Sequence, residues 1–264
     1  MRIIDFHTHA FPDPVAQRIM PKLNEEAESP AVLDGTLSSL LASMDKAAIE
    51  KAVLGSIATK PEQFKPILKW SKAIASERIL PFPSVLPADP QAVERAYIIA
   101  EEGFKGIKLH PQFQGFRLDD EPLFPFFKAL EQTGLLVLMH TGFDMAFERI
   151  RVADPVRIVK VLDAFPDLKL ITTHFGAWKD WDEVRKHLLG KPIYTDVSYS
   201  IQFMPKEEAR ELVLGHPRDY VLFGTDSPWA GQRETIEYVR SLELGPEWER
   251  SVFFDNAARL LGIE

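Results

Sequence analysis

The chain has 264 residues, of which 45% are hydrophobic and 27% are charged, proportions typical of a globular protein. A net charge of −8 argues against a nucleic-acid partner or an acidic membrane surface, and no apolar run is long enough to span a membrane. Cysteine is absent, which excludes disulfides, thiolate metal ligands and thiol nucleophiles. With no signal peptide visible, we expect a cytoplasmic protein that acts on a small molecule.

Short apolar, β-branched runs alternate with longer stretches of helical periodicity along the chain. Several runs, such as residues 135–139, are apolar on both faces, which is typical of strands buried in a parallel sheet. We predict eight strands, at residues 3–9, 52–57, 79–85, 104–110, 135–140, 168–174, 193–198 and 220–226.

Amphipathic stretches separate these strands. Hydrophobic residues recur at helical spacing in residues 37–44 and 64–75, and a final amphipathic helix is predicted at residues 246–261. Residues 11–34 contain several prolines and form a long insertion after the first strand. We expect this insertion to form a lid or part of a substrate pocket.

The alternation of eight strands and helices predicts the fold. In a chain of this length it indicates an α/β protein with a (β/α)8 TIM barrel, formed as one domain over residues 1–264. A doubly wound open sheet is the structural alternative. It lacks its usual fingerprint here, because no Gly-x-Gly-x-x-Gly follows any predicted strand.

Residues of metal-binding type stand at the carboxyl ends of the predicted strands. His7 and His9 are two residues apart on the first strand, so their side chains point to the same face. Further strands end in His110, His140, His174 and Asp226. In a parallel barrel these ends meet at one rim, where active sites are built. Each residue alone could be an ordinary strand-end or turn residue, but together they predict a metal site.

Five motifs follow one another in a fixed order. They are Asp5-x-His7-x-His9, Gly106-Ile107-Lys108-Leu109-His110-Pro111, His140-Thr141-Gly142, His174-Phe175-Gly176 and Gly224-Thr225-Asp226-Ser227-Pro228. As an ordered set, with the closing segment 256–262, they resemble the amidohydrolase superfamily. The resemblance is to its amidohydrolase-2 branch, which includes aminocarboxymuconate-semialdehyde decarboxylase, and it covers nearly the whole chain.

The resemblance implies one divalent metal ion, with zinc the first choice and manganese or iron as alternatives. The implied metal ligands are His7, His9, His140 and Asp226, and the implied catalytic residues are His174 as acid/base and Asp226 beside a metal-activated water. Nitrogen and oxygen ligands without sulfur suit a catalytic zinc site with an open position. Such a metal lowers the pKa of its bound water to about 7.

The fourth predicted strand departs from the two-metal hydrolases of the superfamily, which carry a carboxylated lysine or a glutamate there. Lys108 and His110 share one face of this strand, and we expect both to contact substrate or water. No sequence signal supports carboxylation of Lys108. A second metal held by His110 or His174 stays open.

Loop residues after the strands are candidates for the substrate pocket. The aromatic candidates for an apolar wall, with core packing as the alternative for each, are Phe11, Phe113, Phe116, Phe143 and Trp229. The basic candidates for clamping a substrate carboxylate, with a surface charge as the alternative, are Arg117, Arg149 and Arg151.

The resemblance permits two reactions. We expect metal-dependent hydrolysis of a small, carboxylate-bearing substrate, and the alternative is non-oxidative decarboxylation of an unsaturated or aromatic acid. A metal-binding barrel without catalytic activity is a third possibility. A homodimer also stays open, because members of the family are often dimers or larger.

Overall fold

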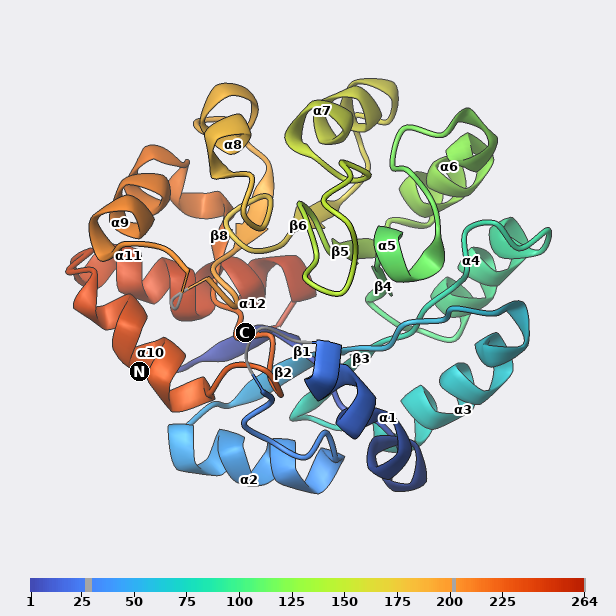
Figure 1. Ribbon diagram of the computed structural model, residues 1–264, viewed down its shortest axis with the longest axis horizontal. Coiled ribbons are helices and arrows are strands. Elements are labelled where there is room, and N and C mark those ends of the chain that lie inside the picture. Colours follow the sequence, from blue (N-terminus) through green and yellow to red (C-terminus); the bar gives the residue numbers. More distant parts are fainter. Residues whose placement is uncertain (27–29, 201–202, 264) are drawn as a thin grey trace.

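The computed structural model describes residues 1–26, 30–200 and 203–263. Parallel strands form a central barrel, and helices surround it (Figure 1). The strands are β1 (Ile4–Thr8), β2 (Lys51–Gly55), β3 (Ile79–Phe82), β4 (Gly106–Leu109), β5 (Leu136–Met139), β6 (Leu170–Thr172), β7 (Tyr194–Asp196) and β8 (Val221–Leu222). Each of them overlaps a strand predicted from the sequence.

The helices connect the strands and close the chain. They are α1 (Asp13–Glu26), α2 (Leu37–Ala47), η1 (Pro61–Gln63), α3 (Phe64–Ile74), α4 (Ala92–Glu101), α5 (Pro111–Gln114), η2 (Glu121–Leu123), α6 (Phe124–Thr133), α7 (Pro155–Ala164), α8 (Trp181–His187), α9 (Lys206–Gly215), η3 (Arg218–Tyr220), α10 (Gln232–Ser241), α11 (Pro246–Arg250), η4 (Ser251–Asp255) and α12 (Asn256–Leu261). Pro61, Pro111, Pro155 and Pro246 each occupy the first helical position, where the missing N–H has no intrahelical partner to lose.

The strands pair in chain order, as a (β/α)8 barrel requires. They form two parallel sheets, β1-β2-β3 and β4-β5-β6-β7-β8. Backbone hydrogen bonds cross both seams: the Lys108 amide donates to Pro83 O and the Phe6 amide donates to Phe223 O, each at 2.8 Å. The predicted barrel and its strand order are therefore confirmed.

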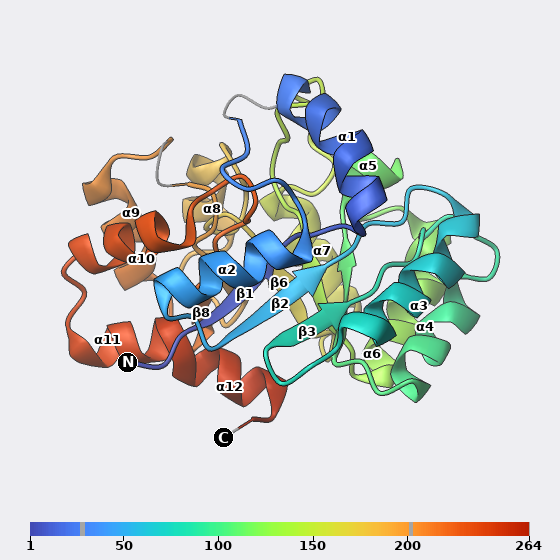
Figure 2. The ribbon, with the colours of Figure 1, turned by 90° about the horizontal axis from the view of Figure 1, so that it is seen from below.

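The two ends of the barrel differ. A buried hydrophobic cluster fills the interior, with Phe6, Val53 and Leu138 from the strands and Ala257 and Leu261 from α12. Figure 2 shows α12 and both termini at one end, and α1 at the end toward which the strand arrows point. The plugged end is thus structural, and the strand-end histidines belong to the open end.

The predicted insertion at residues 11–34 contains α1, while its residues 27–29 lie outside the described residues. The helix predicted at residues 246–261 is a continuous run of α11, η4 and α12. Its middle turn widens into a π-helix, which buries Val252, Phe253 and Phe254 together. In the described part of the chain, no helix is long and apolar enough to cross a membrane.

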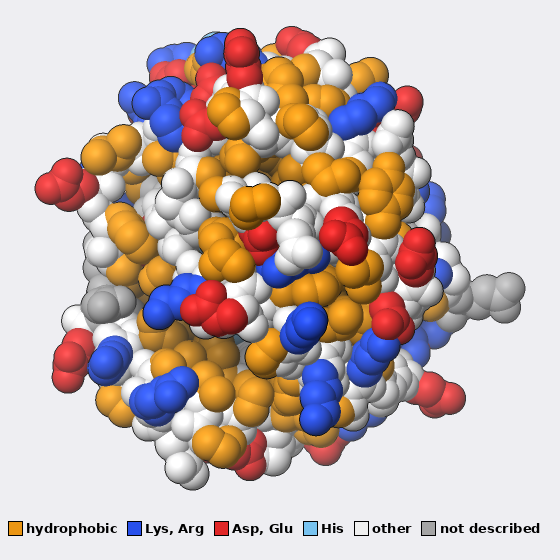
Figure 3. Space-filling view, turned by 90° about the vertical axis from the view of Figure 1, so that its right-hand side faces the viewer, with side chains coloured by type: hydrophobic (Ala, Val, Ile, Leu, Met, Phe, Trp, Pro, Cys, Tyr) orange, Lys and Arg blue, Asp and Glu red, His pale blue; other side chains and the backbone are white. Residues whose placement is uncertain are grey.

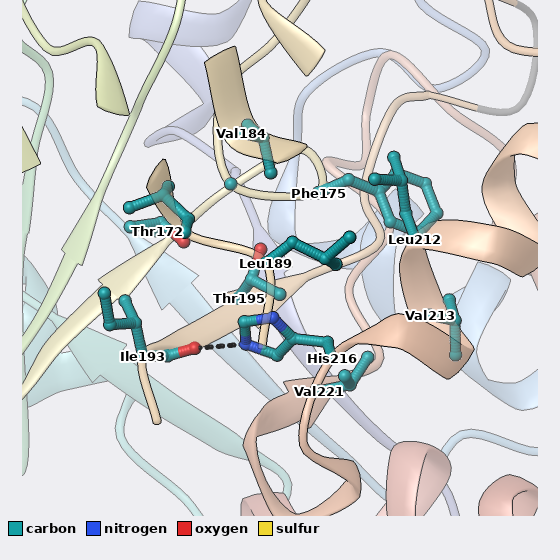
Figure 4. A pocket seen from close by; sticks show the side chains of 12 residues that line it. Thr172, Phe175, Val184, Leu189, Ile193, Thr195, Leu212, Val213, His216 and Val221 are labelled. Carbon is teal, nitrogen blue, oxygen red and sulfur yellow. Dashed lines mark hydrogen bonds between the residues drawn. The ribbon is translucent and has the colours of Figure 1, made fainter. Parts of the chain in front are cut away.

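Neither the face drawn in Figure 3 nor one internal hollow shows a substrate site. On the face in Figure 3, acidic and basic side chains are interspersed among hydrophobic ones. A hollow of about 10 Å³ lies among mostly apolar side chains such as Val184, Leu212 and Val213, beside His216 (Figure 4). It has room for about one water molecule, so a substrate must bind elsewhere.

Candidate metal centre and active site

A cavity of about 680 Å³ opens at the end of the barrel where α1 lies. Its floor carries the polar strand-end side chains of His7, His9, Lys108, His110, Asp144, His140, His174 and Asp226. Its walls are mostly apolar and come from α1, the β2–α3 connection, α3 and the loops after β4, β5, β6, β7 and β8. The cavity therefore joins a polar floor to an apolar body, which is the usual form of a small-molecule site.

Three side chains on the floor converge with the spacing of metal ligands. The Nε2 atoms of His7 and His9 are 3.2 Å apart, and Asp226 Oδ1 lies 3.4 Å from the first and 3.3 Å from the second. Ligand atoms of a tetrahedral zinc site are about 3.3–3.4 Å apart, given metal–nitrogen distances of about 2.0–2.1 Å. These three residues therefore fit a divalent metal ion.

The outer nitrogens of both histidines are held by hydrogen bonds. His7 Nδ1 donates to Asp196 Oδ2 at 2.9 Å, and His9 Nδ1 donates to Gly55 O at 2.8 Å. With Nδ1 protonated, each Nε2 presents its lone pair to the site, as in metalloenzymes whose ligands are oriented by a second layer of residues. The tautomers needed for metal binding are thus built into the fold.

Two glycines make room for this arrangement. A Cβ at Gly224 would lie 2.9 Å from His7 Cβ, and a Cβ at Gly55 would lie 2.9 Å from Lys108 Cγ. Both distances are too short for ordinary packing. Glycine at these positions lets His7 and Lys108 lie against the neighbouring strands.

Lys108 brings a positive charge next to the three converging side chains. Its Nζ lies 2.8 Å from His7 Nε2, and the side chain is fully buried. Burial lowers the pKa of Lys108 to about 8, although Asp226 and Asp196 favour the charged form. The ammonium therefore donates to the His7 Nε2 lone pair, which a metal ion bound by His7 would take in its place.

His140 and His174 form a second pair on the floor. His174 Nδ1 donates to Ser198 O at 3.0 Å, and His140 Nε2 donates to Phe143 O at 2.9 Å. The remaining nitrogens, His174 Nε2 and His140 Nδ1, face each other at 3.1 Å. Two neutral imidazoles so oriented present two lone pairs to each other, an arrangement that a proton or a nearby cation stabilises.

His110 pairs with an acidic residue. His110 Nδ1 accepts a hydrogen bond from the Phe113 amide at 3.5 Å, which leaves Nε2 to face Asp144 Oδ2 at 3.3 Å. The His110 ring also stacks on His140, with centroids 4.1 Å apart. His110, His140 and Asp144 form a second group whose ligand atoms lie within 4.8 Å of one another.

Burial sets the charges of the floor at neutral pH. It lowers the pKa values of His7, His9 and His110, and those of His140 and His174 to about 3 and about 4. Burial raises the pKa values of Asp196 and Asp226, but the neighbouring histidines outweigh this effect and hold both pKa values below the ordinary range. The histidines are therefore neutral and the carboxylates ionised, as metal ligands must be.

The structure brings together most of the site residues proposed from the sequence. His7, His9 and Asp226 converge, while His140 lies beside His174 and is not in that group of three. His174 and Asp226 both adopt positive φ, 59° and 64°, which aspartate and histidine tolerate better than most residues. The role of His140 as a metal ligand stays a prediction.

The proposed substrate residues divide into two groups. Phe113 and Trp229 line the cavity, and their rings lie 4.6 Å from His110 and 5.8 Å from His9 between centroids. Phe143 is buried instead against Trp178, Tyr199 and Ala230.

The three arginines proposed as carboxylate clamps lie away from the cavity. Among the described residues that line it, Arg117, Arg149 and Arg151 are absent. Arg117 is exposed, Arg149 lies over the Phe143 ring, and Arg151 pairs with Asp180 at 2.8 Å.

Sequence reasoning missed three polar residues of the site, one on the floor and two that hold floor histidines by hydrogen bonds. Asp196 and Ser198 end the predicted strand 193–198, so the signal that singled out Asp226 also marks them. Asp144 lies in the loop after β5, and no pattern in the sequence distinguishes it from other loop acids. Arg18, on the cavity side of α1, was also missed.

Comparisons with solved structures show the same fold at low identity. An uncharacterised TIM-barrel protein from Bordetella bronchiseptica is 21% identical, with TM-score 0.74 and 99% of each chain covered. A 2,6-dihydroxybenzoate decarboxylase, solved with 2,6-dihydroxybenzoate, is 14% identical, with TM-score 0.70 and 99% of each chain covered. A 5-carboxyvanillate decarboxylase from Novosphingobium aromaticivorans, solved with manganese and a nitrobenzoic acid, is 16% identical, with TM-score 0.72, covering 99% of this chain and 96% of that one.

No curated protein matches the sequence. The family model described as amidohydrolase matches residues 4–263, nearly the whole chain, as the sequence motifs indicated. The protein therefore belongs to the amidohydrolase family and is an enzyme, either a hydrolase or a carboxy-lyase.

Proposed function

We propose that the enzyme removes carbon dioxide, without oxidation, from an aromatic or unsaturated carboxylic acid. The observation that carries this proposal is the cavity itself, in which an apolar, aromatic-rich body ends on a polar floor. Two of the similar structures with a stated reaction are decarboxylases, and both were solved with a benzoic acid bound. The hydrolysis that we expected first has no comparable support.

The cavity suits a flat acid. Phe113, Trp178 and Trp229 supply aromatic wall, and aromatic side chains favour offset or edge-on contact with a ring. The acid group is expected at the floor, where the Lys108 ammonium supplies a fixed positive charge. A carboxylate bound among these buried floor side chains loses part of its hydration, which favours release of the uncharged carbon dioxide.

A divalent metal held by His7, His9 and Asp226, and by His140 if that prediction is right, would supply positive charge that binds the acid group or a neighbouring substrate oxygen. Manganese and zinc are both candidates, since manganese is present in one similar decarboxylase and zinc suits the ligand spacing.

The reaction needs one proton at carbon. The bond between the ring carbon and the carboxylate breaks, its electron pair stays on the ring carbon, and that carbon takes a proton as carbon dioxide leaves. We assign delivery of this proton to His174, which lines the cavity. Because its Nδ1–H is held by Ser198 O, Nε2 is the nitrogen that takes up a proton from solvent water and then passes it to the ring carbon. Asp196 Oδ1 accepts from the His174 amide at 2.9 Å and holds the residue in place.

The test is a substrate screen on metal-reconstituted protein. We expect carbon dioxide release from aromatic or muconate-type acids, with the protonated ring compound as the second product. His174→Ala should keep the metal and lose turnover by about 10²–10⁴-fold, while His187→Ala, on the exposed end of α8, should behave as wild type. Hydrolysis of lactones, esters or amides without any carbon dioxide release would contradict the proposal.

A further inference from the structure

The α1 helix forms one wall of the cavity and carries two cations on the side that lines it. Val15, Ile19 and Leu23 recur on this side at helical spacing, with Arg18 and Lys22 between them. Arg18 and Lys22 are exposed, whereas the floor histidines are buried, so the two cations lie at the mouth of the cavity. None of the three arginines first proposed as clamps has this position.

Among the residues that the structure describes, no carboxylate pairs with Arg18. Side chains three and four residues apart meet on a helix, and the residues so placed around Arg18 are Pro14, Val15, Pro21 and Lys22. Across residues 1–26, 30–200 and 203–263, no ion pair or side-chain hydrogen bond engages Arg18. Arg78, by contrast, pairs with Asp45 at 2.7 Å.

Gln63, which also lines the cavity, presents a donor. Its Oε1 accepts hydrogen bonds from the amides of Thr59 and Lys60, at 2.7 and 3.0 Å, and from Thr59 Oγ1 at 3.2 Å. The side-chain NH₂ group is left to donate. Among the described lining residues the acids are Asp144 and Asp226, both on the floor. Arg18, Lys22 and the Gln63 side-chain NH₂ group therefore offer donors in the upper cavity.

The cavity is also larger than one ring requires. Its volume of about 680 Å³ is within the range of about 300–1,000 Å³ of sites that hold drug-sized ligands. A single ring with one carboxylate at the floor leaves much of the apolar wall of α1 uncovered. A longer apolar body would cover Val15 and Ile19 and end near Arg18.

We propose that Arg18, assisted by Lys22, binds a second anionic group at the far end of the substrate. The substrate is then an acid with an extended apolar body and an anion at each end, the first at the floor and the second at α1. This inference rests on the proposed decarboxylation for the group at the floor. A guanidinium suits the distal group because it binds a carboxylate through two hydrogen bonds.

Binding of two matched acids tests the inference. The probes are a biphenyl monocarboxylate and the dicarboxylate with its second group on the far ring, titrated calorimetrically into metal-loaded protein. Because the site is exposed, we expect the dicarboxylate to bind about two- to fivefold more tightly. Raised ionic strength should shrink this preference.

The variants are Arg18→Gln and Arg18→Gln with Lys22→Gln. Both should abolish the preference and leave the monocarboxylate affinity unchanged, and circular dichroism checks that α1 remains helical. Lys105→Gln removes an exposed cation just before β4, at the plugged end of the barrel, and should preserve the preference. Equal binding of both acids to wild type, or equal weakening of both by Arg18→Gln, would overturn the inference.

The role of Arg18 and the proposed decarboxylation can each be contradicted while the other is supported. A preference for the dicarboxylate that depends on Arg18, found in protein that releases no carbon dioxide from any acid, supports the inference and contradicts the proposed reaction. Carbon dioxide release from aromatic acids without such a preference supports the reaction and contradicts the role of Arg18.

Discussion

Asp196 Oδ2 accepts a hydrogen bond of 2.9 Å from His7 Nδ1, across 189 residues of sequence. Its other oxygen accepts from the amides of His174 and Ser198, at 2.9 and 3.0 Å, and from Ser198 Oγ at 2.6 Å. Although burial opposes ionisation, His7 and its other partners lower the pKa of Asp196 to about 2. One buried carboxylate therefore positions both a metal-ligand candidate and the residue assigned to proton delivery.

Replacing this carboxylate should weaken metal binding. Asp196→Asn keeps the shape of the side chain but removes its negative charge. That charge favours the Nδ1–H tautomer of His7, and it also makes His7 Nε2 more basic. We expect the metal affinity to fall by about 10- to 100-fold, measured by titrating zinc or manganese into metal-free protein. Asp163→Asn, at an exposed position on α7, is the matched control. Unchanged affinity in Asp196→Asn would show that His7 is oriented without this carboxylate.

The His7, His9 and Asp226 group should determine metal content. His9→Ala removes one converging Nε2 atom, and we expect purified protein to hold well under one equivalent of metal, by elemental analysis, where wild type holds about one. His187→Ala serves as the histidine control. Removal of metal from wild type with a chelator should abolish turnover, and added metal should restore it. A full equivalent in His9→Ala would place the metal in the group of His110, His140 and Asp144.

The barrel was predictable because its signals are local. Each strand is a short apolar run, and helices occupy the intervals, so the order of elements follows from periodicity alone. His7, His9 and Asp226 were found because ligand-type residues at the ends of parallel strands must share a rim. No knowledge of the contacts was needed for either step.

The partners of those residues were not predictable, because they depend on side-chain rotation and loop paths. Asp144 reaches His110 only through the course of the loop after β5. Arg117 and Arg18 are both basic residues in segments that follow strands, yet only Arg18 lines the cavity, because α1 turns that side inward. Periodicity identifies the face of a helix but not the element that it covers.

Lys108 should need a glycine at position 55 to keep its position. In Gly55→Ala the new Cβ would lie 2.9 Å from Lys108 Cγ and 3.1 Å from its Cβ, inside a fully buried region. We expect a loss of about 1–3 kcal/mol in the free energy of unfolding, as for other overpacked cores, measured by urea denaturation. If the clash with Lys108 is the cause, the loss should be smaller in a Lys108→Ala background, with a coupling of about 0.5–3 kcal/mol. Additive losses would point to a different cause.

His216 should make stability depend on pH. It lies beside the small hollow in Figure 4, and its Nε2 donates to Ile193 O at 2.7 Å. Burial lowers the pKa of His216 below the ordinary 6.5, although this hydrogen bond opposes the shift. In the unfolded chain the pKa is the ordinary one, so the unfolded state takes up a proton first as the pH falls.

The sign of the effect follows from that difference. The stability associated with neutral His216 is fully present above about pH 6.5 and is lost as the pH falls toward the lower pKa of the folded state, with a slope of at most about 1.4 kcal/mol per pH unit. His216→Gln keeps a side-chain donor for Ile193 O but does not titrate. Urea denaturation between about pH 7.5 and about pH 5.5 should therefore show wild type losing more stability than the variant. The other buried histidines titrate in both proteins, so the difference isolates His216, and parallel losses would mean that His216 is equally protonated in the folded and unfolded chains.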